Sequence, residues 1–184
     1  MKRGTDWEDK IQMTLDDMSM LGMRHTIVKT EAPVKVIRHV KGAQCLVVFT
    51  APGQCDFEGA WPLRGKDTRC VPVCIEAKET NQPRISITDG KAFKDSQVER
   101  LDATMKMVGI AGALVRFRPG GQTPECWGIP WRVRELLLQE NVKSFKMHDL
   151  YNRGAMKFGN PLRPSAEEMR DFLNHCFFMA EVRS

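Results

Sequence analysis

The sequence predicts a single α/β domain in which helices flank a central mixed β-sheet. The length of 184 residues fits one domain of about 100–200 residues. Helical periodicity and strand-like alternation follow one another in the order helix, strands, helix, strands, helix. The run 71–75 is apolar throughout, which is typical of a strand that is buried on both faces.

The first helix is predicted to start at Thr5, because Thr5-x-x-Glu8 has the form of a capping box. Apolar side chains then recur at three- and four-residue spacing, and Gly22 is expected to end the helix. The apolar face of this helix consists of Trp7, Ile11, Leu15 and Met18.

Two strands are predicted next, over 33–37 and 45–49, with the turn signal Lys41-Gly42 between them. Together they form an expected hairpin. After the buried run 71–75, a second helix is expected to be capped by Asp95. Its apolar face is predicted to contain Val98, Leu101, Met105 and Val108.

Two further strands are predicted over 112–117 and 125–131, on either side of the turn Pro119-Gly120-Gly121. The region 132–160 has no clear periodicity and carries no prediction. We find no linker or repeat, so residues 1–184 are expected to form one domain.

A final helix is predicted within 161–184, because Ser165-x-x-Glu168 again has capping-box form. Apolar residues follow at helical spacing, which predicts one buried face. That face consists of Met169, Phe172, Leu173 and Cys176.

The chain carries 28 basic and 23 acidic residues, which leaves a net charge of +5. This balance favours a polyanionic partner without identifying it. No apolar run approaches the roughly 18 residues that span a bilayer, and the N-terminus lacks the apolar stretch of a signal peptide. We therefore expect a cytoplasmic protein with no membrane partner.

The six cysteines form no Cys-x-x-Cys pair, which favours free thiols in a reducing compartment. The sequence also contains no Gly-x-x-x-x-Gly-Lys-[Ser/Thr] loop, so no nucleotide cofactor is expected. The cysteines are Cys45, Cys55, Cys70, Cys74, Cys126 and Cys176.

A carboxylate and an amine lie at the end of the buried run, in Glu76-Ala77-Lys78. Side chains alternate along a strand, so Glu76 and Lys78 face the same way. A neighbouring antiparallel strand would bring the carboxylate of Asp56 beside that of Glu76. Two carboxylates and the Ala77 carbonyl suit Mg²⁺, and a metal-activated water near Lys78 would attack a phosphodiester.

The pattern of Asp56 followed by Glu76-Ala77-Lys78 resembles the PD-(D/E)xK nuclease signature, although Cys55 stands where the signature has proline. The same three residue types also occur in proteins that are not nucleases. The alternative interpretation is an exposed strand end with a minor salt bridge.

Five segments resemble, in order, the landmarks of the RecU-type Holliday-junction resolvases, over roughly residues 3–118. The Asp-aromatic-x-Gly and Glu-Ala-Lys-Glu-Thr elements among them form a more specific set than the three-residue signature. The segments are Arg3-Gly4-Thr5-Asp6-Trp7-Glu8, Ala32-Pro33-Val34-Lys35-Val36-Ile37, Asp56-Phe57-Glu58-Gly59, Ile75-Glu76-Ala77-Lys78-Glu79-Thr80 and Ser96-Gln97-Val98-Glu99-Arg100-Leu101.

The resemblance implies a restriction-endonuclease-like fold, with a central mixed sheet, flanking helices and a protruding β-hairpin or stalk. It also implies a homodimeric, metal-dependent endonuclease that resolves four-way DNA junctions by paired symmetric nicks. The implied cofactor is Mg²⁺, with Mn²⁺ as the alternative. The implied location is the cytoplasm of a bacterial or phage-infected bacterial cell.

The resemblance implies Asp56 and Glu76 as metal ligands, beside the carbonyl of Ala77, and Lys78 as the catalytic lysine. Glu58 would share the face of Asp56 and is a candidate secondary ligand.

Glu8 and Gln97 are implied as further active-site groups. Each has an alternative role: Glu8 completes a capping box with Thr5, and Gln97 satisfies a free backbone group in the first turn of its helix. Glu79 faces the other side of the strand and is expected to pair with Arg84 or another base instead of a metal.

The stalk is assigned to residues 38–54, and the alternative is an ordinary sheet hairpin. Trp127 and Trp131 are expected in the core, with stacking on DNA bases as the alternative. The residues expected to contact DNA are Arg38, Lys41, Arg64, Lys66 and Arg69.

Two other functions remain open at this point. One is a nuclease of the same superfamily that acts on duplex or damaged DNA, which a comparison of junction with linear duplex distinguishes. The other is a non-catalytic junction-binding protein, in which Glu76→Ala would leave the activity unchanged.

Overall fold

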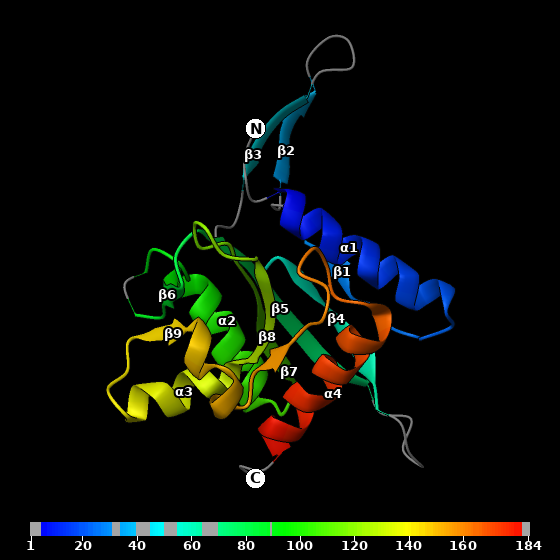
Figure 1. The fold of residues 1–184 in the computed structure, drawn as a ribbon. Coiled ribbons are helices and arrows are strands. Elements are labelled where there is room, and N and C mark those ends of the chain that lie inside the picture. The colour runs from blue at the N-terminus through cyan, green and yellow to red at the C-terminus, as the bar shows by residue number, and fades with distance from the viewer. Residues whose placement is uncertain are drawn as a thin grey trace.

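The computed structural model of the 184-residue chain describes residues 5–30, 34–39, 45–49, 55–63, 70–88 and 90–181. At its centre is a six-stranded mixed sheet (Figure 1). In spatial order the strands are β1 (Val28–Lys29), β4 (Phe57–Pro62), β5 (Cys70–Thr80), β7 (Ile110–Phe117), β8 (Glu125–Pro130) and β10 (Met156–Lys157).

The two central strands, β5 and β7, are parallel, and every other neighbouring pair in this sheet is antiparallel. The parallel connection runs through helix α2 (Asp95–Lys106), as parallel strands require a crossover. Every residue of β7 is buried, because helices cover both faces of the sheet. The predicted α/β class with a restriction-endonuclease-like mixed sheet is confirmed.

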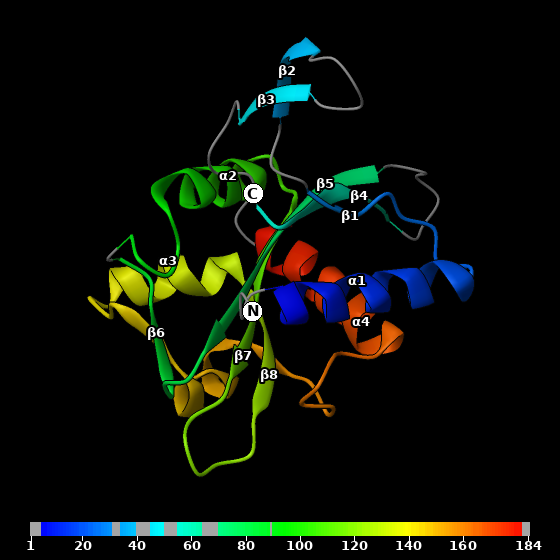
Figure 2. The same cartoon turned by 90° about the horizontal axis from the view of Figure 1, so that it is seen from above.

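Four helices form the two outer layers. Figure 2 shows α1 (Thr5–Met20) and α4 (Ala166–Glu181) on one side of the sheet, with α2 and α3 (Trp131–Gln139) on the other. The side chains of β5 alternate between two cores, so Ile75 and Ala77 pack on the side of α1 and α4. Cys74 points to the side of α2 and α3.

Two glycines in adjacent strands make room for one aromatic ring of α4. A Cβ atom at Gly112 would lie 2.7 Å from Phe172 Cζ, and one at Gly128 would lie 2.5 Å from Phe172 Cδ2. Both distances are shorter than a van der Waals contact, so a larger residue would displace the ring. The absence of a side chain at these positions lets the fully buried Phe172 pack directly on the sheet.

Two small sheets accompany the central one. β2 (Val34–His39) and β3 (Cys45–Phe49) pair antiparallel and stand away from the central sheet in Figure 1, which confirms the predicted hairpin. Its use as a stalk, assigned to 38–54, stays a prediction. β6 (Arg84–Ser86) pairs with β9 (Ser144–Lys146) on the side of α2 and α3.

Several predicted boundaries are confirmed. Helix α1 buries Trp7, Ile11, Leu15 and Met18, and Gly22 has the positive φ of 75° that ends such a helix. The capping box of α4 is present: Ser165 N–H donates to Glu168 Oε2 at 2.8 Å, and Glu168 N–H donates to Ser165 Oγ at 3.2 Å.

Other boundaries are corrected. Asp95 is the first residue of α2 and not its cap, because the extended residue that precedes the helix is Lys94. Val108 lies beyond the helix, with φ of 56°. The strand predicted over 125–131 ends at Pro130. Trp131 begins helix α3, which was not predicted because most of it lies in the region 132–160, for which no prediction was made.

The described part of the chain has no helix that is long and apolar enough to cross a membrane. Trp127 and Trp131 are 4% and 1% exposed. Their placement confirms the prediction that both belong to the core.

Candidate active site

The site lies where strand β4 begins and β5 approaches its end. The antiparallel ladder pairs Phe57 with Ile75, so Asp56 stands at the end of the ladder, opposite the chain that leads on to Ala77. Asp56 Oδ2 accepts a hydrogen bond from Ala77 N–H at 2.8 Å. On the other side, the backbone oxygen of Asp56 accepts from Thr30 N–H at 2.8 Å, so both its backbone and its side chain are held.

Glu76 is the most buried charged residue of the site, with 0% of its surface exposed. Its Oε1 accepts hydrogen bonds from Lys78 Nζ and from Gln97 Nε2, the latter at 2.5 Å. Its Oε2 is buried and has no hydrogen-bond partner among the described residues. A buried carboxylate oxygen without a partner is costly, so this position favours an additional ligand.

The surroundings of Glu76 oppose its negative charge. Burial is the main cause that raises the pKa of Glu76 to about 8, and the negative charge of the Asp56 carboxylate raises it as well. The nearby Lys78 ammonium acts in the opposite direction and lowers this pKa. Two carboxylates that face each other in a buried site repel when both are ionised. A divalent cation between them would remove this repulsion.

Ala77 contributes its backbone to the same place. In a strand, the N–H and C=O of one residue point to the same neighbouring strand. Since the Ala77 N–H points to Asp56, its carbonyl also faces the side where the β4 ladder has ended. Asp56, Glu76 and Ala77 therefore offer oxygen donors of the kind that Mg²⁺ binds, and the unpartnered Oε2 leaves one of them open to such an ion. Their role as metal ligands stays a prediction.

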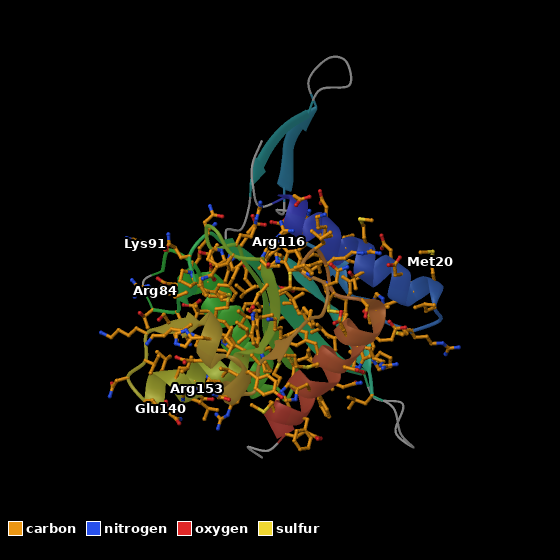
Figure 3. All side chains as sticks on the ribbon, viewed as in Figure 1. Met20, Arg84, Lys91, Arg116, Glu140 and Arg153 are labelled. Atoms are coloured by element: carbon orange, nitrogen blue, oxygen red, sulfur yellow. The ribbon has the colours of Figure 1, made fainter. Side chains whose placement is uncertain are left out.

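Lys78 forms the mouth of the site. Its side chain is 21% exposed, is paired with Glu76 and lies 5.7 Å from the centre of the Phe93 ring. It also lines an open hollow of about 420 Å³, to which Arg84 and Lys91 contribute further positive charge. Figure 3 shows Arg84 and Lys91 close together at this edge of the molecule. The hollow is suited to an anionic chain such as a phosphodiester backbone.

Gln97 connects helix α2 to the buried carboxylate. Its Oε1 accepts from the Lys94 backbone N–H at 3.1 Å, while its Nε2 donates to Glu76. The backbone role that the sequence offered is therefore present, and the same side chain also reaches Glu76, while its role as an active-site group stays a prediction. The amide orients one oxygen of Glu76 and leaves the other open.

Glu8 is placed differently from the other predicted residues. It lies on α1, on the opposite side of the sheet from Gln97, and pairs with Lys29 Nζ at 3.2 Å. Lys29, the partner of Glu8, is on β1 and pairs with Phe57 of β4, the residue that follows Asp56. Glu8 therefore contacts the strand next to the one that Asp56 precedes. The contacts of the described residues do not join Glu8 to Glu76, and its catalytic role stays a prediction.

The carboxylate of Glu79 pairs away from Glu76, as expected, although Glu79 also lines the hollow beside Lys78. Its carboxylate accepts from Arg116 Nε at 2.8 Å and from Arg118 Nη1 at 3.0 Å. Arg116 Nη2 also donates to Asp6 at 3.0 Å, and its guanidinium lies 4.9 Å from the centre of the Trp7 ring. Among the residues that the structure describes, Glu79 therefore pairs with these two arginines and not with the suggested Arg84.

The predicted DNA contacts fall largely beyond what the structure describes. Lys41, Arg64, Lys66 and Arg69 lie outside the described residues, and for Arg38 the structure gives the strand position alone. Their roles stay predictions.

Sequence reasoning missed a second cluster beside the site. Cys55, Glu58 and Cys74 bring their sulfur and carboxylate atoms within 4.8 Å of one another. Hydrogen bonding to Cys74 and burial raise the pKa of the Cys55 thiol far above its usual range. Glu58, the suggested secondary ligand, is held by Arg100 at 2.8 and 3.1 Å. Only the β4–β5 register, which sets Glu58 opposite Cys74, reveals this cluster.

Comparison with known protein families identifies a match that covers most of the chain. Residues 2–163 match the family model RecU, described as Recombination protein U. No curated protein matches the chain. The matched range includes all the residues of the site described above and both central strands of the sheet.

Proposed function

We propose that this chain is a divalent-metal-dependent endonuclease that cuts Holliday junctions. The proposal starts from its family, because the chain belongs to the Recombination protein U family of nuclease-type resolvases. The expected products are paired symmetric nicks, made by hydrolysis of one phosphodiester bond at each site. The observation that carries the proposal is the buried Glu76, which has one oxygen oriented by Lys78 and Gln97 and the other unpartnered beside Asp56.

Asp56, Glu76 and the Ala77 carbonyl would hold the cation. All three donors are oxygen atoms, which favours Mg²⁺, with Mn²⁺ as the substitute. When bound, a divalent cation supplies positive charge to the reacting phosphate and activates the attacking water.

The protein's own groups would orient the substrate. The Lys78 ammonium, at the mouth of the hollow, would bind a non-bridging phosphate oxygen and stabilise the negative charge that develops there. Gln97 would keep Glu76 in one orientation through its two hydrogen bonds. Arg84 and Lys91 would bind neighbouring phosphates along the hollow.

The substrate has two equivalent strands to cut, which favours a two-fold symmetric homodimer with one site in each subunit. The β2–β3 hairpin would enter the junction as a stalk, with Arg38 and Lys41 on phosphates. Arg64, Lys66 and Arg69 would contact an arm of the DNA. The chain would act in the cytoplasm of a bacterial or phage-infected bacterial cell.

The test is cleavage of a labelled synthetic four-way junction beside an equimolar linear duplex of the same sequence. Each reaction is run with Mg²⁺, with Mn²⁺ and with EDTA. Lys78→Ala is compared with Lys106→Ala, which removes an exposed lysine at the C-terminal end of α2, at the opposite end of this helix from Gln97. We expect symmetric nicks in the junction alone, which are lost with EDTA and with Lys78→Ala but kept with Lys106→Ala.

The other outcomes separate the alternatives. Equal cleavage of both DNAs would keep the metal site and replace the junction by duplex as substrate. Tight junction binding without cleavage in either metal would identify a non-catalytic binding protein and contradict the roles given to Lys78 and Glu76. Analytical ultracentrifugation of the same sample tests the dimer, which a purely monomeric species at all concentrations would contradict.

A further inference from the structure

Cys55, Glu58 and Cys74 meet on the face of the sheet that helix α2 covers. Glu58 and Cys74 are directly opposite each other in the β4–β5 ladder, and the Cys55 thiol contacts that of Cys74. The Cys55 Sγ also lies 4.0 Å from the backbone oxygen of Gln97. Both sulfurs are buried, with 0% and 1% of the two residues exposed. These contacts do not involve the carboxylates of the proposed Mg²⁺ site.

The distances suit a single tetrahedral ion. The three ligand atoms lie within 4.8 Å of one another. A zinc ion takes thiolates at about 2.3 Å and carboxylate oxygens at about 2.0–2.2 Å, which separates its ligands by roughly 3.5–3.8 Å. A small inward rotation of these side chains would therefore bring all three onto one ion.

The donors differ in kind from those of the neighbouring site. Thiolates are soft ligands that select zinc and related ions over Mg²⁺, which prefers oxygen. We propose that Cys55, Glu58 and Cys74 form a second cation site, specific for Zn²⁺, directly behind the candidate active site. The proposal does not depend on the nuclease function.

Arg100 supports such a site from outside. It holds both oxygens of Glu58, with Nε to Oε1 at 3.1 Å and Nη2 to Oε2 at 2.8 Å. Carboxylates that bind metals are usually oriented by outer hydrogen bonds of this sort. Two thiolates and one carboxylate would leave a Zn²⁺ complex with one negative charge, which the Arg100 guanidinium neutralises.

The site would influence the neighbouring carboxylate through the chain. Cys55 directly precedes Asp56, and Cys74 lies two residues before Glu76 on the same face of β5. A cation bound to both cysteines would cross-link the start of β4 to β5. The cross-link would hold Asp56 in register with Ala77.

The test uses Co²⁺ as a spectroscopic probe, added to the purified full-length protein under reducing conditions. We expect one equivalent to produce the visible bands of tetrahedral Co²⁺ and a near-ultraviolet thiolate charge-transfer band, both abolished by Zn²⁺. Cys55→Ala and Cys74→Ala should lose the charge-transfer band. Cys70→Ser, which removes an exposed thiol of the same strand, should keep it.

Two further variants make the result specific. Asp56→Asn removes a ligand of the proposed Mg²⁺ site and should keep the thiolate band, so a failure of the nuclease proposal leaves this result readable. Glu58→Gln, at a partly exposed position, should weaken Co²⁺ binding at least tenfold without the loss of a core sulfur. Circular dichroism of each variant checks that it is folded.

Three results would overturn the proposal. One is the absence of a thiolate band in the wild-type protein. Another is a band that persists at full intensity in both folded alanine variants. The third is a count of free thiols in the denatured protein, backed by peptide mapping, that shows Cys55 and Cys74 joined as a disulfide.

Discussion

Gln97 Nε2 donates a hydrogen bond to the buried Oε1 of Glu76 at 2.5 Å, across the space between helix α2 and strand β5. The same amide is anchored at its other end by the Lys94 backbone N–H. One side chain thereby links the start of a helix to the carboxylate at the centre of the proposed active site.

Replacement of Gln97 by methionine keeps the volume of the side chain and removes both hydrogen bonds. We expect junction cleavage to fall by about 10–100-fold and the Mg²⁺ concentration at half-maximal rate to rise, because Glu76 loses its orienting partner. Glu99→Gln, at an exposed position of the same helix, is the control. Unchanged Mg²⁺ dependence in Gln97→Met would contradict the positioning role.

The raised pKa of Glu76 predicts how stability depends on pH in the absence of metal. The folded pKa is about 8, against an ordinary value of 4.5. In this window the folded state binds more protons than the unfolded state. The free energy of unfolding therefore falls as pH rises from about 4.5 to about 8.

Glu76→Gln should remove this contribution, because the amide does not titrate. We expect the free energy of unfolding, measured by urea denaturation in EDTA, to fall more between pH 5 and pH 8 in the wild type than in Glu76→Gln. The expected difference is on the order of a few kcal/mol. Parallel pH profiles of the two proteins would show that the buried carboxylate does not carry the shift. Mg²⁺ should reduce the wild-type loss, since it stabilises the ionised form.

Arg116 and Arg118 both pair with Glu79, but burial separates their expected effects. The side chain of Arg116 is 5% exposed and that of Arg118 is 50% exposed. Arg116→Met leaves the nearly buried Glu79 with a single exposed partner, and we expect a loss of about 3 kcal/mol. Arg118→Met should cost about 0–1 kcal/mol. Urea denaturation measures both, and equal losses would contradict the difference.

The contact of Gly128 with Phe172 predicts a packing defect on substitution. A Cβ atom at Gly128 would lie 2.5 Å from the Phe172 ring and 2.8 Å from Phe158 Cζ, so Gly128→Ala should destabilise the fold by about 1–3 kcal/mol. Gly120→Ala serves as the control, because a Cβ atom added at Gly120 would have no other atom within 4 Å. A Phe172→Leu background should reduce the cost of Gly128→Ala. Equal cost in both backgrounds would show that Phe172 does not set the cost, which would then fall to Phe158.

The periodicity of the sequence was sufficient to predict three of the four helices that form the outer layers of the fold. Helices α1 and α4 follow from apolar spacing and from capping residues, because both signals are local in the chain. Helix α3 was missed, since Trp131 continues an apolar strand and no capping residue precedes it. Asp95 was predicted to cap α2 but is its first helical residue, because sequence alone does not distinguish a cap from the first residue of the helix.

The sequence by itself determined that Glu76 and Lys78 share one face of a buried strand, because side-chain alternation is a local property of the backbone. It also determined the resemblance that the family match later confirmed. Other features depend on which strands become neighbours and in what register. The Asp56–Ala77 bond, the anchoring of Gln97 on Glu76 and the meeting of Cys55, Glu58 and Cys74 were decided by the tertiary structure alone. Each of these contacts joins segments that lie about twenty positions apart in the chain. The local sequence does not specify which distant residues become neighbours, because that depends on strand pairing and register.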